Sequence, residues 1–316
     1  MFALTQGSQN VNVLFRLTKV DQMKAAAFDY IRPDTLEAVL EALGRVGDEG
    51  RIIAGGQTLV PMMAMRLVKA ELLIDINHIQ TLAGIHLSNE SLSIRACTRQ
   101  AEAAASEKII NKLPLLAKAL EHVGHTQTRN RGTVGGSIAN ADPSAEIPIV
   151  ARCLDAKIVA LKKDGERQIC AGNFFYSAMD TALEDTECLT EVRFPIWSEE
   201  VVGSGFHEVS IRNSDYALVA VAAQLATDFG GKCTRAAVAV GGCAPAAVKI
   251  DAVEKALVGK PLSDAAFNEA CGLVVEALDP DTDVHATAEY RKRVAGRIVR
   301  RVLEEARAEV YEARNE

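Results

Sequence analysis

The sequence has little of what marks several large classes of protein. Acidic residues outnumber basic ones, 42 to 35, and the net charge of −7 argues against non-specific nucleic-acid binding. Aromatic residues are only 5% of the chain, and no apolar run is long enough to span a bilayer. With 48% hydrophobic and 24% charged residues, the composition predicts a soluble globular protein.

The seven cysteines contain no Cys-x-x-Cys pair and are widely spaced. An odd number at wide spacing favours reduced thiols that pack as small apolar residues, which predicts a cytoplasmic protein. The spacing supplies no iron–sulfur or zinc ligand set. The six histidines show no metal-ligand spacing either. The sequence therefore predicts no metal site in this chain.

Familiar nucleotide-binding and catalytic motifs are also missing. There is no Gly-x-Gly-x-x-Gly segment and no P-loop, so the two simplest nucleotide sites are excluded. Neither His-Glu-x-x-His nor Gly-x-Ser-x-Gly occurs. Because nothing in the pattern marks an activated nucleophile, we infer that a bound cofactor supplies the chemistry.

Two double-glycine segments stand out, one at residues 54–61 (AGGQTLVP) and one at residues 133–143 (TVGGSIANADP). In each, an apolar run leads to a Gly-Gly pair, a small hydroxyl residue and a helical pattern. Glycine permits positive φ and close approach of another group, and successive N–H groups can hold an anion. One such segment is more often a plain turn. Two built alike predict a site for the diphosphate of an extended ligand.

The length of 316 residues allows two domains. Residues 1–22 fit the pattern poorly and are expected to form a mobile N-terminal extension, with Met23 as a candidate start. The rest of the first domain, 23–198, divides into subdomains at about 23–81 (β-loop-helix-β) and 82–198. The second subdomain is expected to contain a hairpin at 84–98, helices at 99–111 and 114–123, and strands at 156–163, 166–171 and 187–194.

Polarity rises at residues 197–200, where we place the boundary of a second domain, 199–316. Three antiparallel strands are expected at 206–211, 217–227 and 234–240, before helices at 252–258, 264–278 and 286–311. This order indicates an α+β layout. The basic residues between Arg291 and Arg301 alternate with an apolar face and predict a solvated helix face. Asp142 and Pro143 predict an N-cap and the first residue of a helix.

Three segments resemble the FAD-binding medium subunit of molybdenum hydroxylases, the family of aerobic carbon monoxide dehydrogenase and xanthine dehydrogenase flavoproteins. They are residues 54–63, 129–137 and 140–148. The similarity runs from about Phe28 to about Val310 in the same domain order. It implies an FAD-binding domain of two subdomains, similar to vanillyl-alcohol oxidase, and a C-terminal α+β domain with a three-stranded antiparallel sheet.

The resemblance also implies roles for individual residues. The FAD diphosphate would be held by backbone N–H groups and hydroxyls of two sets, Ala54, Gly55, Gly56, Gln57 and Thr58, and Thr133, Val134, Gly135, Gly136 and Ser137. Asp215 would hydrogen-bond to the cofactor, Tyr216 would shield one isoalloxazine face, and Leu189 would make an apolar contact. Gly135→Val is expected to abolish FAD binding and leave much of the fold.

Three positions depart from the family pattern. Gln57 stands where many relatives have His, and His207 stands where relatives often have Lys or Glu. Glu146 stands where the family usually has an Asp that binds the sugar-like chain of FAD; its extra methylene still reaches. Tyr216 alone, without the resemblance, would be an ordinary strand aromatic, and Asp142 is interpreted as a helix cap rather than a cofactor contact.

The resemblance implies a complex. A large subunit would carry the molybdopterin-type cofactor, a small subunit would carry two [2Fe-2S] clusters, and this chain would pass electrons through FAD to an external acceptor. Quinone, cytochrome, NAD and oxygen stay open as acceptors. A dimer of heterotrimers is expected. Two alternatives also stay open, namely a self-contained flavin oxidase, with His125 as the nearby residue for a covalent link, and a docking scaffold without FAD.

Overall fold

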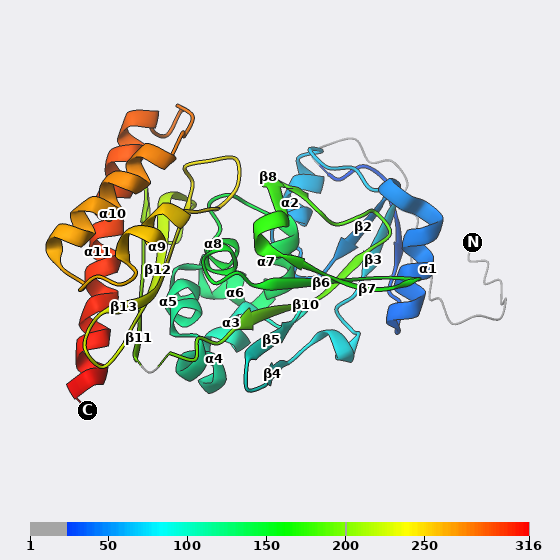
Figure 1. Ribbon diagram of the computed structural model, residues 1–316. Coiled ribbons are helices and arrows are strands. Elements are labelled where there is room, and N and C mark those ends of the chain that lie inside the picture. The colour runs from blue at the N-terminus through cyan, green and yellow to red at the C-terminus, as the bar shows by residue number, and fades with distance from the viewer. Residues whose placement is uncertain (1–23, 200, 316) are drawn as a thin grey trace, which may run out of the picture.

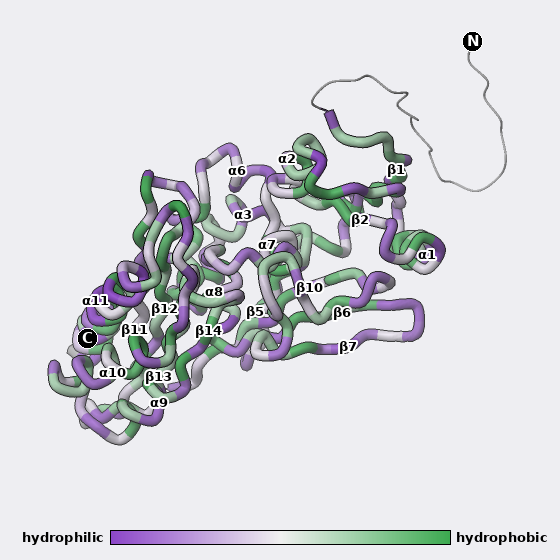
Figure 2. The backbone as a smooth tube through the Cα atoms, turned by 90° about the horizontal axis from the view of Figure 1, so that it is seen from above, coloured by the Kyte–Doolittle hydropathy of each residue, from purple (hydrophilic) through white to green (hydrophobic). Residues whose placement is uncertain are grey.

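The computed structural model describes residues 24–199 and 201–315, so the predicted extension at 1–22 lies outside the described residues. Three main sheets follow one another along the molecule, from the blue N-terminal strands to the sheet beside the red C-terminal helix (Figure 1). Hydrophobic residues are concentrated along the central strands and hydrophilic residues in the turns (Figure 2). The arrangement is the predicted α+β class.

The first sheet is parallel, with the order β1 (Asp29–Ile31), β3 (Leu72–Asp75), β2 (Gly50–Ile53). Helix α1 (Leu36–Val46) covers it and starts at Thr35, whose hydroxyl accepts a hydrogen bond from Ala38 N. The short helix α2 (Leu59–Ala64) follows the first glycine segment. The predicted β-loop-helix-β unit is confirmed. β1 was missed because three residues carry too little periodicity.

The second sheet is antiparallel, with the order β4 (Ile85–Leu87), β5 (Ser91–Arg95), β10 (Cys188–Pro195), β6 (Lys157–Lys162), β7 (Gly165–Cys170). The predicted hairpin and three strands are confirmed. The helices beside it are α3 (Gln100–Ala104), α4 (Glu107–Lys112), α5 (Pro114–His122), α6 (Thr126–Arg131), α7 (Val134–Asn140) and α8 (Glu146–Cys153). A small hairpin, β8 (Phe175–Ser177) and β9 (Asp180–Thr181), precedes β10.

The predicted N-cap at Asp142 is wrong. Helix α8 begins at Glu146 and its N-cap is Ala145. The side chain of Asp142 instead closes a turn in the loop before α8, where its Oδ1 accepts a hydrogen bond from Ser144 N at 2.9 Å. An aspartate that closes such a local turn cannot also cap a helix four residues later.

The third sheet has four strands, where the sequence predicted three. The long strands β11 (Val201–Ser210), β12 (Ala217–Thr227) and β13 (Cys233–Gly241) are joined by the two-residue β14 (Val248–Lys249). Helices α9 (Asp251–Leu257), α10 (Asp264–Ala277) and α11 (Ala288–Asn315) follow. Helix α11 packs on β11 and β12. A two-residue strand has no readable alternation, which is why β14 was missed.

The two faces of β12 belong to different cores. Val219, Val221 and Leu225 pack with helices α9, α10 and α11. Ala220 and Ala222 point to the other face and share a core with helices α5 and α8 of the preceding region. Alanine has little bulk, so α8 can lie close against the sheet. One hydrophobic core therefore extends from residue 92 to residue 247.

The basic stretch of α11 is solvated except at its start. Arg291 is buried, and its guanidinium donates to the carbonyls of Leu218 and Gly242 and pairs with Asp283 at 2.7 Å.

All seven cysteines are free thiols; Cys170 is exposed, Cys271 is half-buried and the other five are buried. Within the described ranges, every helix is too short or too polar to cross a bilayer.

Candidate functional site

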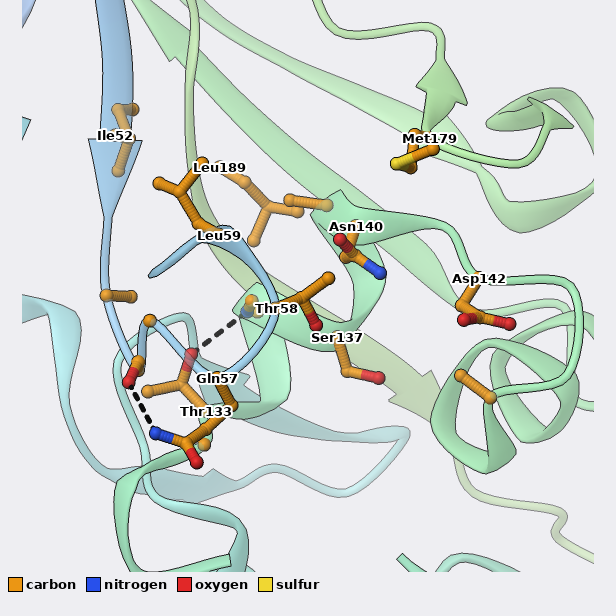
Figure 3. A pocket seen from close by; sticks show the side chains of 18 of the residues that line it. Ile52, Gln57, Thr58, Leu59, Thr133, Ser137, Asn140, Asp142, Met179 and Leu189 are labelled. Carbon is orange, nitrogen blue, oxygen red and sulfur yellow. Dashed lines mark hydrogen bonds between the residues drawn. The ribbon is translucent and has the colours of Figure 1, made fainter. Parts of the chain in front are cut away.

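A cleft of about 840 Å³ lies between the first sheet, the helices α7 and α8, and the loop before β12. Thirteen of the fifteen predicted site residues line it: Ala54, Gly55, Gly56, Gln57, Thr58, Thr133, Gly135, Gly136, Ser137, Glu146, Leu189, Asp215 and Tyr216. They come from four regions far apart in the sequence, 54–58, 133–146, 189 and 215–216. Figure 3 shows how Thr58 and Ser137 project toward the same space between the two glycine segments.

The first glycine segment is a true loop with unused donors. It runs from the end of β2 to the start of α2, and Gly56 has a φ of 70°, a conformation that favours glycine. Among the described residues, no acceptor faces the backbone N–H groups of residues 55–58. The Thr58 hydroxyl makes no capping bond, and Gln57 Nε2 donates to Gly55 O at 3.2 Å. This loop can hold an anion as it stands.

The second glycine segment is built differently from the first, and the N–H groups expected to hold the diphosphate already have partners. It follows helix α6, and its glycines form the first turn of α7. Its N–H groups are already used: Val134 N donates to Thr98 O, Gly135 N to Ala96 O, and Ser137 N to Thr133 O. Gly136 N donates to Thr133 Oγ1 at 3.0 Å, so Thr133 is the N-cap. The Ser137 hydroxyl has no partner among the described residues, and the Thr133 hydroxyl, which accepts from Gly136 N, keeps its own O–H as a donor.

A carboxylate-rich wall forms another part of the cleft. Asp142, Glu146 and Asp215 line it together with Tyr216. Burial raises the pKa of Glu146 to about 7, and it also raises the pKa of Asp142. Partial burial and these three carboxyl groups raise the pKa of Tyr216. Such a wall suits ligand groups that donate hydrogen bonds, such as hydroxyls.

Leu189 reaches the cleft because strand β10 is irregular beside it. The pairing of β10 with β6 shifts its register between Leu189 and Glu191. The residue between them, Thr190, bonds with its hydroxyl to Val159 O and accepts from Ala96 N at its own carbonyl. A bulge re-aims a neighbouring side chain, and Leu189 provides an apolar wall near Thr58 (Figure 3).

Two predicted site residues do not line the cleft. Val134 is fully buried in the core under α7. His207 lies beside α11, where Arg301 Nη1 is 3.1 Å from its Nε2; burial and this arginine lower the pKa of His207. His122 lies next to it, edge-on, and is 3.5 Å from Glu208, which raises the pKa of His122.

Several lining residues were not among those predicted to hold FAD. Asn140 and Asp142 face the cleft, as does Met179 from the β8–β9 turn (Figure 3). The first two lie in a segment that was singled out, and Ala141 between them has a left-handed φ of 49° that turns the chain. Nothing in the sequence pattern marks Met179. His125 also lines the cleft.

Taken together, the cleft offers free N–H donors and hydroxyls at one place and carboxylates at another. Among the described residues that line it, no hydroxyl or thiol is hydrogen-bonded to a histidine or a carboxylate. This chemistry fits an elongated ligand with an anionic group and a hydroxylated chain, as in a flavin dinucleotide. Ala54 to Thr58, Ser137 and Glu146 are the residues placed to hold it.

Comparison with known proteins agrees with this cleft. Residues 26–197 match the sequence-family model of the FAD binding domain in molybdopterin dehydrogenase. Residues 204–306 match that of the CO dehydrogenase flavoprotein C-terminal domain.

Similar full-length proteins are known in sequence and structure. The alpha subunit of the 6-hydroxypseudooxynicotine dehydrogenase complex of Paenarthrobacter nicotinovorans is 38% identical over 90% of this chain and 96% of that protein. The carbon monoxide dehydrogenase medium chain of Afipia carboxidovorans is 32% identical over 90% of this chain and 99% of its own length. A chain of carbon monoxide dehydrogenase from Hydrogenophaga pseudoflava superposes with a TM-score of 0.88, at 32% identity, over 91% of this chain and all of that chain. The chain therefore belongs to the FAD-binding medium subunits of molybdenum hydroxylases, the carbon monoxide dehydrogenase and xanthine dehydrogenase family, and is an oxidoreductase subunit.

Proposed function

We propose that this chain binds one FAD in the cleft and serves as the electron-transfer flavoprotein of a heteromeric molybdenum hydroxylase. The observation that carries the proposal is the set of N–H groups at residues 55–58 that have no partner among the described residues, in a loop that lines the same cleft as Ser137 within an FAD-binding family domain. When bound, FAD supplies the redox chemistry by taking electrons from the [2Fe-2S] clusters of a small subunit and passing them to an external acceptor.

Different residues of the cleft would bind different parts of the cofactor. The N–H groups of residues 55–58 and the hydroxyls of Thr58 and Ser137 donate to the diphosphate. Glu146 accepts from hydroxyls of the sugar-like chain. Leu189 packs against an apolar part of the cofactor. Tyr216, about two thirds exposed at the cleft edge, covers one face of the isoalloxazine, and Asp215 beside it accepts a hydrogen bond.

The partners would be a large subunit with the molybdopterin-type cofactor and a small [2Fe-2S] subunit, assembled as a dimer of heterotrimers in the cytoplasm. Relatives that this chain matches over nearly their whole length are a subunit of a dehydrogenase complex and a medium chain of carbon monoxide dehydrogenase. In this arrangement the substrate pocket belongs to the large subunit. The present chain then sets the electron outlet of the complex, not its choice of substrate.

An absorption spectrum before and after acid precipitation tests the proposal. Purified chain, reconstituted with FAD, should show flavin bands at about one per chain, and acid should release intact FAD into the supernatant. Flavin that stays in the pellet would indicate a covalent link, with His125 as the residue to examine, and would favour a self-contained oxidase. A chain that takes up no FAD alone or with its partner subunits would contradict the proposal.

A further inference from the structure

The first glycine segment contacts, through backbone atoms, the two residues that precede the second. A β-carbon on Gly55 would lie 2.5 Å from Arg131 O and 2.8 Å from Gly132 Cα. The loop that carries the free N–H groups therefore rests directly on the chain that leads into α7. This contact joins the first sheet to the second region, and its geometry decides where the free donors point relative to Ser137.

The side chain of Asn77 is hydrogen-bonded to the first glycine segment. It follows β3, and its Nδ2 donates to Ala54 O at 2.7 Å and to Asp75 Oδ1 at 2.6 Å. Asp75 is itself fixed, because its Oδ2 accepts from the Tyr30 hydroxyl at 2.6 Å and its Oδ1 accepts from Asn77 N at 2.9 Å. The Asn77 side chain thus ties the loop to the strand ends of the first sheet.

Arg99 holds the second segment and meets Asn77. Its Nη2 donates to Asn77 Oδ1 at 2.7 Å, and its Nη1 donates to Arg131 O. Arg99 also pairs with Thr133 as an isolated β-bridge. The planar guanidinium can serve two acceptors in fixed directions, which a lysine cannot do. Neither Asn77 nor Arg99 lines the cleft.

We propose that Asn77 and Arg99 form a clasp that fixes the spacing of the two glycine segments and so prearranges the diphosphate site. This inference rests on the proposed FAD function. The clasp consists of Asn77 and Arg99 with their acceptors Ala54 O and Arg131 O. These are positioning residues: they bond to the backbone of Ala54, at the start of the first glycine segment, and of Arg131, just before the second. The N–H groups of residues 55–58, which line the cleft, keep no partner among the described residues. Prearrangement raises affinity because the ligand then does not have to order the loop.

Titration of the flavin-free chain with FAD tests the clasp. We expect Asn77→Ala and Arg99→Ala each to raise the Kd for FAD at least tenfold. Because both remove the same hydrogen bond, the double variant should lose less than the product of the two single losses. Arg32→Ala is the matched control. Arg32 bonds to His78 Nε2 at 3.1 Å on the same sheet but contacts neither loop, so its Kd should equal that of the wild type.

Arg99→Lys separates positioning from charge. If Arg99 acted by attracting the diphosphate, lysine would restore affinity; the clasp predicts that it does not. Lysine keeps the charge and much of the bulk, so this variant also serves where Arg99→Ala fails to fold. An unchanged Kd in Asn77→Ala, or wild-type affinity in Arg99→Lys, overturns the clasp.

Hydrogen exchange in the flavin-free chain gives a readout that does not depend on FAD. The amides of Val60, which donates to Gly56 O, and of Gln100, which donates to Gly132 O, should lose protection several-fold in the clasp variants, while the amides of α11 stay unchanged. A wild type that binds no FAD but shows this difference would overturn the proposed function and leave the clasp standing. Equal exchange in all variants would overturn the clasp alone.

Discussion

Gly135 packs directly on Ala96. Its N–H donates to Ala96 O at 3.0 Å, and a β-carbon on Gly135 would lie 2.6 Å from Ala96 Cβ. The glycine is therefore needed for this contact within the protein, whatever ligand approaches it from the cleft.

Gly135→Val should consequently damage the fold. Forcing a branched side chain into this contact displaces α7 from β5 and should cost about 3 kcal/mol or more. Thermal unfolding of the flavin-free protein measures it. Gly272→Ala is the control, since nothing lies within 4 Å of a β-carbon there and helix propensity predicts a gain of about 0.5–1 kcal/mol. A Gly135→Val variant with wild-type stability and no FAD would restore the original interpretation.

Thr133 and Ser137, four residues apart, should respond in opposite ways. Thr133→Val removes the N-cap of α7 and should lower the free energy of unfolding by about 1 kcal/mol. Ser137→Ala removes a hydroxyl without a recorded partner among the described residues, so stability should hold while the Kd for FAD rises severalfold. Chemical denaturation and FAD titration of both variants give the comparison. The reverse pattern would show that Thr133, not Ser137, contacts the cofactor.

Glu146 should make stability depend on pH. Its pKa is about 7 in the folded protein and 4.5 as the unperturbed value, so the folded state binds more protons and stability falls as pH rises from about 4.5 to 7. The upper limit of this loss is about 3 kcal/mol. Glu146→Gln should remove it and be more stable than the wild type at pH 8, but not at pH 4.5. Parallel stability curves for the two proteins would contradict this.

The same carboxyl should couple FAD binding to protons. Hydroxyl donors from the cofactor favour the ionised form of Glu146, so binding should release protons near pH 7 and affinity should rise with pH. Calorimetry in two buffers of different ionisation enthalpy measures the release. In Glu146→Gln the release should disappear, and its persistence would assign the proton to another group, such as Asp142.

Tyr216 should affect flavin reactivity more than flavin retention. Its side chain is about two thirds exposed and supports no core, so Tyr216→Ala should unfold at the wild-type temperature and keep FAD. Reoxidation of the reduced flavin by small acceptors should become faster by a few-fold, as one face is uncovered. Tyr216→Phe keeps the ring and is expected to behave like the wild type. Unchanged rates in Tyr216→Ala would remove the shielding role.

The sequence predicted most of the fold because its strands are apolar or alternating runs bounded by turn residues and its long helices carry one apolar face. It failed where a signal was short, as in β1 and β14, or where a local turn competed for a side chain, as at Asp142. The glycine segments are the instructive case. The two segments have similar sequences. The backbone N–H groups of residues 55–58 have no partner among the described residues, whereas those of Val134 and Gly135 donate to the carbonyls of Thr98 and Ala96, nearly forty positions away. The sequence pattern alone does not show whether a backbone N–H group is bonded to a distant part of the chain in the folded protein.

The alanines of β12 have a thermodynamic consequence. Because Ala220 and Ala222 share a core with α5 and α8, cutting the chain near residue 198 would expose apolar surface on both fragments. We expect the intact chain to melt in one calorimetric transition, with equal calorimetric and van't Hoff enthalpies, and the fragments to aggregate when made separately. The two regions that match separate family models would then unfold as a single cooperative unit. A destabilising substitution in α11 would therefore weaken FAD binding, although α11 does not line the cleft.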